Sequence, residues 1–186
     1  EELWGTEPEP YLFSYAFTKK ALLIGQRAYC QEFGLDAVSL ILPTVYGPRD
    51  DYTEMSHVMG ALIGKFVQAA KNEQDEVEVW GDGRQVREFV HVDDVVDALV
   101  MVSERPVQSD IMNLGSSNGQ SIANLAEMIA ELSGFKGKIV YNSNRFVGAE
   151  ARVLDSSLIT KETGWKPKIE IRSGIAAAID WYARQL

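Results

Sequence analysis

The sequence predicts an α/β protein in which short apolar strands alternate with helices. Helix-period segments are separated by brief apolar runs, and Gly, Pro or polar turns bound each run. One continuous apolar run follows a glycine-terminated helix, which is typical of a buried parallel strand. The 186 residues, 46% of them hydrophobic, are enough for one domain with a sizeable core.

The first helix is expected from Ser14 to about Phe33, with Gly34 as its C-cap. Its apolar residues occupy most faces, which predicts burial on more than one side. Further along the chain, Asp93 and Ser121 are expected to cap two helices. In order, the expected elements are a loop at 1–13, a helix at 14–33, a strand at 37–42, a polar loop at 44–56, a helix at 56–71, strands at 76–80 and 87–92, a helix at 93–103, a strand at 111–114, a loop at 115–120, a helix at 122–133, a strand at 138–141 and helices at 156–163 and 171–185.

Composition excludes several classes of protein. A net charge of -9, from 27 acidic and 18 basic residues, argues against nucleic acid as a main partner. A single cysteine, Cys30, excludes an intrachain disulfide scaffold and a multi-cysteine zinc module. No apolar run is long enough for a membrane span, and the acidic start does not resemble a signal peptide. A soluble, cytoplasmic protein without a metal centre is therefore expected.

The first candidate for chemistry is the pair Tyr15 and Lys19. Residues at i and i+4 lie on one face of a helix. An ammonium group beside a phenol favours the phenolate, so the pair suits proton exchange with a substrate hydroxyl. Tyr-x-x-x-Lys is a weak motif by itself, because the spacing also arises by chance. His57, at the start of a predicted helix, is either a structural residue or an acid/base group.

Four further features admit a functional and a structural interpretation. The segment 45–50 follows an apolar strand, at the sheet edge where ligands bind, or it is a simple Gly-Pro turn. The Gly81-x-Gly83 pair is better explained as a β-hairpin turn than as a dinucleotide fingerprint, because a strand follows it. Near it, His91 with Asp93 and Asp94 suggests metal ligands or, more simply, a strand end and a helix cap. The loop 115–121 either holds a phosphate with its amides or merely connects two elements.

Taken in order, these motifs resemble the extended short-chain dehydrogenase/reductase superfamily, the NAD-dependent epimerase/dehydratase group that acts on nucleotide sugars. The resemblance is carried by five segments and covers nearly the whole chain. They are Tyr15-x-x-x-Lys19, Pro43-Thr44-Val45-Tyr46-Gly47-Pro48, Val79-Trp80-Gly81-Asp82-Gly83, Arg87-Glu88-Phe89-Val90-His91-Val92-Asp93-Asp94 and Gly164-Trp165-Lys166-Pro167. The segment from Ser56 to Phe66 is most similar to the GDP-L-fucose synthase branch.

The resemblance implies a role for each matching residue. Tyr15 would be the catalytic acid/base, Lys19 would hold the nicotinamide ribose, and His57 would transfer protons during epimerisation. The matching substrate-binding positions are Thr44, Lys65, Trp80, Arg87 and Arg152. Among these, Lys65 stands where the GDP-L-fucose synthase branch has an arginine, and Thr44 stands where many relatives have an asparagine. NADP or NAD would be the cofactor, a nucleotide-diphosphate sugar the ligand, and a homodimer or other homo-oligomer the assembly.

The resemblance also implies that residues 1–186 are one truncated unit. They would form the C-terminal part of a Rossmann-like parallel sheet together with the small α/β substrate-binding domain. The sequence contains no Gly-x-x-Gly-x-x-Gly segment between a strand and a helix. Tight binding of the cofactor by this chain alone is therefore not expected. Two interpretations follow. In the first, the chain is part of a nucleotide-sugar epimerase/reductase, either of the GDP-L-fucose synthase branch or of a sister group acting on UDP- or dTDP-sugars. In the second, it is a non-enzymatic module that binds nucleotide sugars or associates with itself.

Overall fold

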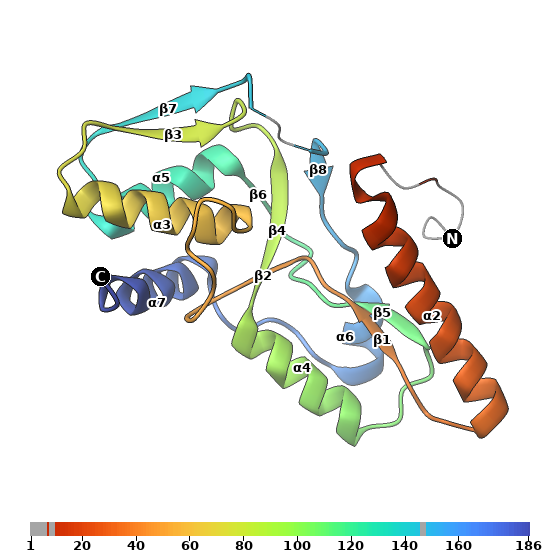
Figure 1. Ribbon diagram of the computed structural model, residues 1–186. Helices are drawn as coiled ribbons and strands as arrows, with labels where there is room; N and C mark the ends of the chain where they lie inside the picture. Colours follow the sequence, from red (N-terminus) through yellow and green to blue (C-terminus); the bar gives the residue numbers. More distant parts are fainter. Residues whose placement is uncertain (1–6, 8–9, 146–147) are drawn as a thin grey trace.

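The computed structural model describes residues 7, 10–145 and 148–186, and it has the predicted α/β class (Figure 1). Most of the element boundaries lie within two residues of those expected. The elements in order are η1 (Pro10–Leu12), α2 (Phe13–Phe33), β1 (Ser39–Ile41), β2 (Thr44–Tyr46), α3 (Val58–Lys71), β3 (Glu76–Trp80), β4 (Val86–His91), α4 (Val92–Glu104), β5 (Ile111–Asn113), β6 (Gly119–Ser121), α5 (Ile122–Ser133), β7 (Lys138–Asn142), β8 (Ala151–Arg152), α6 (Ser157–Thr163) and α7 (Ile171–Ala183).

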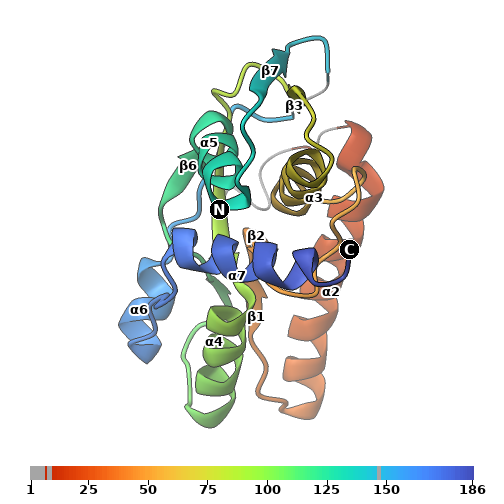
Figure 2. The same ribbon diagram turned by 90° about the vertical axis from the view of Figure 1, so that its left-hand side faces the viewer.

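The strands form three small groups, and all but one of their pairings are parallel. β1 pairs with β5, and β3 pairs with β7. β4 is the central strand, because it pairs with β2 and β8 in parallel and with β6 in antiparallel orientation. The helices α3, α5 and α7 gather on the β3–β7 side, while α4 and α6 lie beside β1 and β5 (Figures 1 and 2).

Two apolar cores stabilise this arrangement. The larger core joins α3, α5, α7 and β3 through buried side chains such as Phe66, Ile129 and Ile175. The smaller core joins α4, β5 and α6 around Leu114 and Trp165. Because β4 contributes Phe89 to the first core and Val90 to the second, the alternation of its side chains links the two.

Three strand predictions are corrected by the structure. Residues 44–46, expected in a polar loop, form β2, because the chain bends at Pro43 and leaves β5 to pair with β4. Residues 119–121, expected to be mainly loop, form β6. A Cβ on Gly119 would lie 2.4 Å from Val86 Cγ1, so only glycine permits this close antiparallel pairing. The two-residue strand β8 was not expected at all.

The hairpin predicted at Gly81–Gly83 is wrong. β3 and β4 flank this turn, but they belong to different sheets and do not pair with each other. The turn is held by the start of α5 instead, where the Ala123 N–H donates to the Gly83 carbonyl (2.9 Å). Long-range pairing of β3 with β7 therefore overrides the local hairpin signal.

The expected cap of α4 is also corrected. The N-cap is His91 rather than Asp93, since the His91 imidazole Nδ1 accepts a hydrogen bond from the Asp93 N–H (3.2 Å). The helix thus begins at Val92. Two other predicted caps are confirmed: the Ser121 hydroxyl accepts from the Asn124 N–H (3.1 Å), and Gly34 adopts the left-handed conformation at the end of α2.

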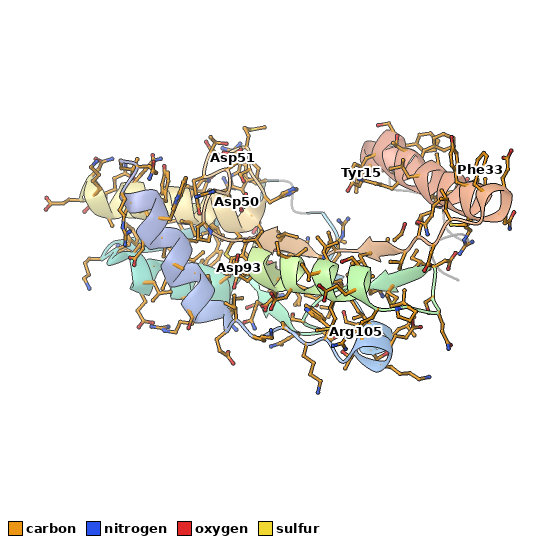
Figure 3. The ribbon with its side chains drawn as sticks, turned by 90° about the horizontal axis from the view of Figure 1, so that it is seen from below. Tyr15, Phe33, Asp50, Asp51, Asp93 and Arg105 are labelled. Carbon is orange, nitrogen blue, oxygen red and sulfur yellow. The ribbon has the colours of Figure 1, made fainter. Side chains whose placement is uncertain are left out.

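Helix α2 has the predicted extent but not the predicted burial. It lies along one side of β1, set apart from the remaining helices (Figures 1 and 3). Leu23 is its only buried residue among those described, while Phe17 is 64% exposed. Polar contacts anchor the helix: Gln26 Nε2 donates to the Ala37 and Asp110 carbonyls, each at 3.0 Å. Several faces of α2 are apolar and could pack against other segments. Among the described residues, only one face does so.

Among the described residues, β1 pairs with β5 alone, so its other edge has no strand partner there. The loop expected over residues 1–13 lies mostly outside the described residues, and Pro10–Leu12 form a short 3-10 helix. None of the helices traced here is both long and apolar enough to cross a bilayer.

Candidate functional site

A cavity of about 370 Å³ lies between α3, β3 and the start of β4. It brings together four residues that the sequence analysis selected, namely His57, Lys65, Trp80 and Arg87. These residues are up to thirty positions apart in the sequence, and they come from three elements. The cavity is therefore the candidate ligand site.

Regular secondary structure places each of these side chains. His57 is the N-cap residue of α3, and Lys65 follows on the same helical face as Val58, Ala61 and Leu62, which also line the cavity. Trp80 ends β3, and Arg87 is the second residue of β4. The site thus has a helical wall and two strand ends.

The Trp80 indole carries two cations. Lys65 Nζ lies 5.3 Å from its ring centroid, and Arg145 Cζ lies 5.2 Å from it. Both distances are typical of cation–π interactions. Sequence reasoning missed Arg145, which has no motif around it. Only the parallel register of β3 with β7, in which Trp80 faces Asn142, brings this part of the chain to the indole.

Two carboxylates balance these cations. Glu54 Oε1 lies 3.1 Å from Lys65 Nζ, and Glu78 Oε1 lies 3.3 Å from Arg145 Nε. A hydrogen bond from the Asn142 amide, assisted by Arg145, lowers the pKa of Glu78 below its ordinary value. Glu78 therefore remains ionised at neutral pH, and the cavity wall contains paired charges of both signs.

Two polar atoms of the cavity wall are buried without a hydrogen bond to any described residue. They are the indole N–H of Trp80 and the amide oxygen of Gln85. Buried donors and acceptors are almost always paired in proteins. An unpaired donor and an unpaired acceptor are available to hydrogen-bond a polar ligand, and the two nearby cations would favour an anionic one.

The remaining predicted site residues lie elsewhere. Tyr15 and Lys19 contact each other near the start of α2, with Lys19 Nζ 5.3 Å from the Tyr15 ring centroid, but neither lines the cavity. Tyr15 lies at the opposite end of α2 from Phe33 (Figure 3). Thr44 begins β2, where it pairs with Phe89 and does not reach the cavity. The i, i+4 geometry expected of the Tyr/Lys pair is therefore present, at a distance from the substrate-binding candidates.

Arg152 also lies outside the cavity lining, but it is next to one of its residues. It belongs to β8, and its register partner on β4 is Arg87. Paired residues of parallel strands point to the same face of a sheet. The structure thus places two arginines side by side at the rim of the site.

The alternative sites receive no support from the geometry. The described residues contain no cluster of three His, Cys, Asp or Glu side chains suited to a metal ion. His91 caps α4, and the Asp94 carboxylate accepts from the Lys168 and Ile169 N–H groups. In the loop at 115–121, the Ser117 N–H that could have met a phosphate donates to a carboxylate of this chain instead (2.6 Å).

Comparisons with known proteins show which family the chain is similar to. The NAD dependent epimerase/dehydratase family matches residues 1–115. The probable GDP-L-fucose synthase 1 of Oryza sativa subsp. japonica is 38% identical over 96% of this chain and 54% of its own length. The chain thus spans about half the length of the curated relatives that it matches.

The fold is shared with solved structures, of which two illustrate the likeness. UDP-glucose 4-epimerase from Thermotoga maritima, solved with UDP-glucose, is 26% identical with a TM-score of 0.83, over 92% of this chain and 53% of its own. A GDP-mannoheptose C4 reductase from Campylobacter jejuni, solved with NADP, is 26% identical with a TM-score of 0.79, over 96% and 62% respectively. On the extent of these matches, the chain belongs to the NAD-dependent epimerase/dehydratase family.

Proposed function

We propose that this chain is the substrate-binding portion of an NADP-dependent nucleotide-sugar epimerase/reductase similar to GDP-L-fucose synthase. The observation that carries the proposal is the cavity at the end of β3, where Lys65 and Arg145 lie close to the Trp80 ring and Arg87 also lines the wall. An aromatic ring suits a nucleotide base, and guanidinium groups suit a diphosphate. The relatives named above are enzymes, which favours this function over a non-enzymatic binding module.

The proposed mechanism divides the work between two places in the chain. At the cavity, Trp80, Lys65, Arg87 and Arg152 would bind the nucleotide part of the substrate. At α2, the Tyr15 hydroxyl would donate its proton to a developing alkoxide on the sugar, and the Lys19 ammonium group would favour the resulting phenolate. His57, which lines the cavity, would exchange protons with sugar carbons during epimerisation.

The described residues fit NADP only in part. Tyr15 and Lys19 are in contact, as a residue pair that orients a nicotinamide ribose requires. When bound, the cofactor would supply the hydride. The sequence contains no glycine-rich turn for the pyrophosphate, so the expected affinity of this chain alone for NADPH is low.

Calorimetric titration with GDP and UDP tests the nucleotide site. Replacing Arg87 with alanine should reduce the binding free energy of the preferred nucleotide by about 1.5–3 kcal/mol, the range for hydrogen bonds to charged groups. Arg84→Ala is the matched control, because Arg84 is exposed in the turn just before β4 and does not line the cavity. Equal affinity of the Arg87 variant and the parent protein would contradict the site.

A further inference from the structure

The buried carboxylate of Glu88 joins three segments of the chain. Glu88 is only 1% exposed. One oxygen accepts from the Ser117 N–H (2.6 Å) and the Ser116 hydroxyl (3.2 Å), while the other accepts from the Leu154 N–H (2.7 Å). Burying a carboxylate is costly unless such donors compensate it. The side chain therefore braces β4, the connection after β5 and the segment after β8 against one another.

The surroundings of Glu88 are shaped for this role. A Cβ on Gly115 would lie 2.3 Å from Glu88 Oε1, so glycine is needed where the carboxylate sits. Ser117, whose N–H reaches Glu88, adopts a left-handed backbone conformation (φ 54°) that non-glycine residues rarely use. The Ser117 hydroxyl in turn accepts from the Ser156 N–H (3.1 Å), which adds a second link to the segment after β8.

The strand β8 depends on this brace. It has only two residues, and the Val86 N–H bonds the Glu150 carbonyl just before it (2.8 Å). The bond from Leu154 to Glu88 holds the chain two residues beyond Arg152. Glu88 thus fastens the far end of the shortest strand in the described structure.

The brace holds two like charges together. Arg87 and Arg152 are register partners on adjacent parallel strands, so their side chains leave the same face. Glu88, the next residue along β4, points to the opposite face. Like charges on neighbouring strands repel, and this arrangement becomes favourable when an anion binds between them.

We propose that Glu88 is a positioning residue for ligand binding: by fastening the segment after β8, it holds Arg152 beside Arg87, and the two guanidinium groups together receive a diphosphate. This inference rests on the proposed nucleotide-sugar function. Glu88 does not touch the ligand, so all of its influence on affinity passes through Arg152.

A double-mutant cycle with GDP as the probe tests the proposal. The purified parent, Glu88→Gln, Arg152→Ala and the double variant are titrated by calorimetry, and their thermal unfolding midpoints are recorded. Each single variant should lower GDP affinity about tenfold, the expected loss for a charge-assisted phosphate contact. In the Arg152→Ala background, Glu88→Gln should cost less than about twofold more, because its effect acts through Arg152. Glu76→Gln, an exposed substitution on β3, is the matched control.

The possible results separate the two proposals. If Glu88→Gln costs as much affinity with Arg152 present as without it, or costs none, the positioning role is overturned. If Arg87→Ala weakens binding while neither Glu88 nor Arg152 matters, the proposed function stands and this inference falls. If neither Arg87→Ala nor Arg152→Ala changes the affinity for GDP, the assignment of the nucleotide site is wrong. If Glu88→Gln does not fold, Glu88→Asp replaces it, because aspartate keeps the charge on a shorter side chain. Its loss of GDP affinity should likewise be large with Arg152 present and small in the Arg152→Ala background.

Discussion

At the scale of single residues, the cavity is a set of charges that satisfy one another around the Trp80 ring. Lys65 contacts Glu54 and also donates to the Glu78 carbonyl (3.4 Å). Lys65 is mostly buried, whereas 60% of the Glu54 side chain is exposed. An incoming diphosphate would therefore compete with Glu54 for the same ammonium group, and the glutamate can leave into water at little cost.

Removing that competitor should tighten nucleotide binding. Glu54→Gln is expected to raise GDP affinity about two- to fivefold, which is the strength of an exposed ion pair. Calorimetry at two salt concentrations measures the effect, which should shrink as salt screens the charges. Glu73→Gln makes the same change in net charge at an exposed position outside the cavity lining. A weaker or unchanged affinity for Glu54→Gln would mean that Lys65 does not meet the phosphates.

At the scale of elements, short segments depend on side chains from distant helices. α6 contributes Glu162, whose carboxylate accepts from the Gln108 N–H (2.8 Å), the Ser109 N–H (3.3 Å) and the Ser109 hydroxyl. The hydrogen bond from the Ser109 hydroxyl contributes most to lowering the pKa of Glu162 below its ordinary value, and the two N–H groups add to it. The ionised form therefore stabilises the connection between α4 and β5.

This contact should make stability depend on pH in a defined direction. Because the folded-state pKa of Glu162 lies below the unfolded-state value of about 4.5, its contribution is present above that pH and is lost as the pH falls through the folded-state pKa. Glu162→Gln should lower the thermal unfolding midpoint at pH 7, and the difference from the parent should vanish in acid. Midpoints measured across pH 7 to 3 by circular dichroism check this. A difference that stays constant over the whole range would rule out the carboxylate as its source.

At the scale of the whole molecule, α2 and the edge of β1 lack cover within the described structure. Phe13, Phe17 and Ile24 recur on one helical face, and each is more than half exposed. Leaving such side chains in water forgoes about 1.5–3 kcal/mol each. A β-strand edge with unpaired amides next to an apolar face is a template for association.

We therefore expect the protein to form a homo-oligomer, most simply a dimer, through α2. Sedimentation velocity at micromolar concentration should show the dimer for the parent protein. The double substitution Phe17→Glu and Ile24→Glu should shift it to monomer, because both side chains are exposed and their replacement leaves the cores intact. Met55→Glu, at an apolar residue that is 88% exposed but lies outside α2, should leave the dimer unchanged. A folded monomer of the parent would refute the expectation.

The amino-acid sequence by itself determined the class of fold, most helix boundaries and four of the residues that line the candidate cavity. Helical caps such as Ser121 and Gly34 act within a few residues, so local chemistry was sufficient to predict them. The motifs around Trp80 and Arg87 were recognisable because they are contiguous, and both lie within residues 1–115, which match the family.

Only the tertiary structure decided how these parts meet. β3 pairs with β7 across more than fifty residues, and that pairing replaced the local hairpin and brought Arg145 to Trp80. β8 has no sequence signal of its own. It pairs with β4, and the buried carboxylate of Glu88 accepts from the Leu154 N–H just after it. The apolar faces of α2 were predicted from the sequence, but their exposure among the described residues was not. Long-range pairing and burial depend on which segments distant in the sequence contact one another. Local periodicity contains no information about those contacts.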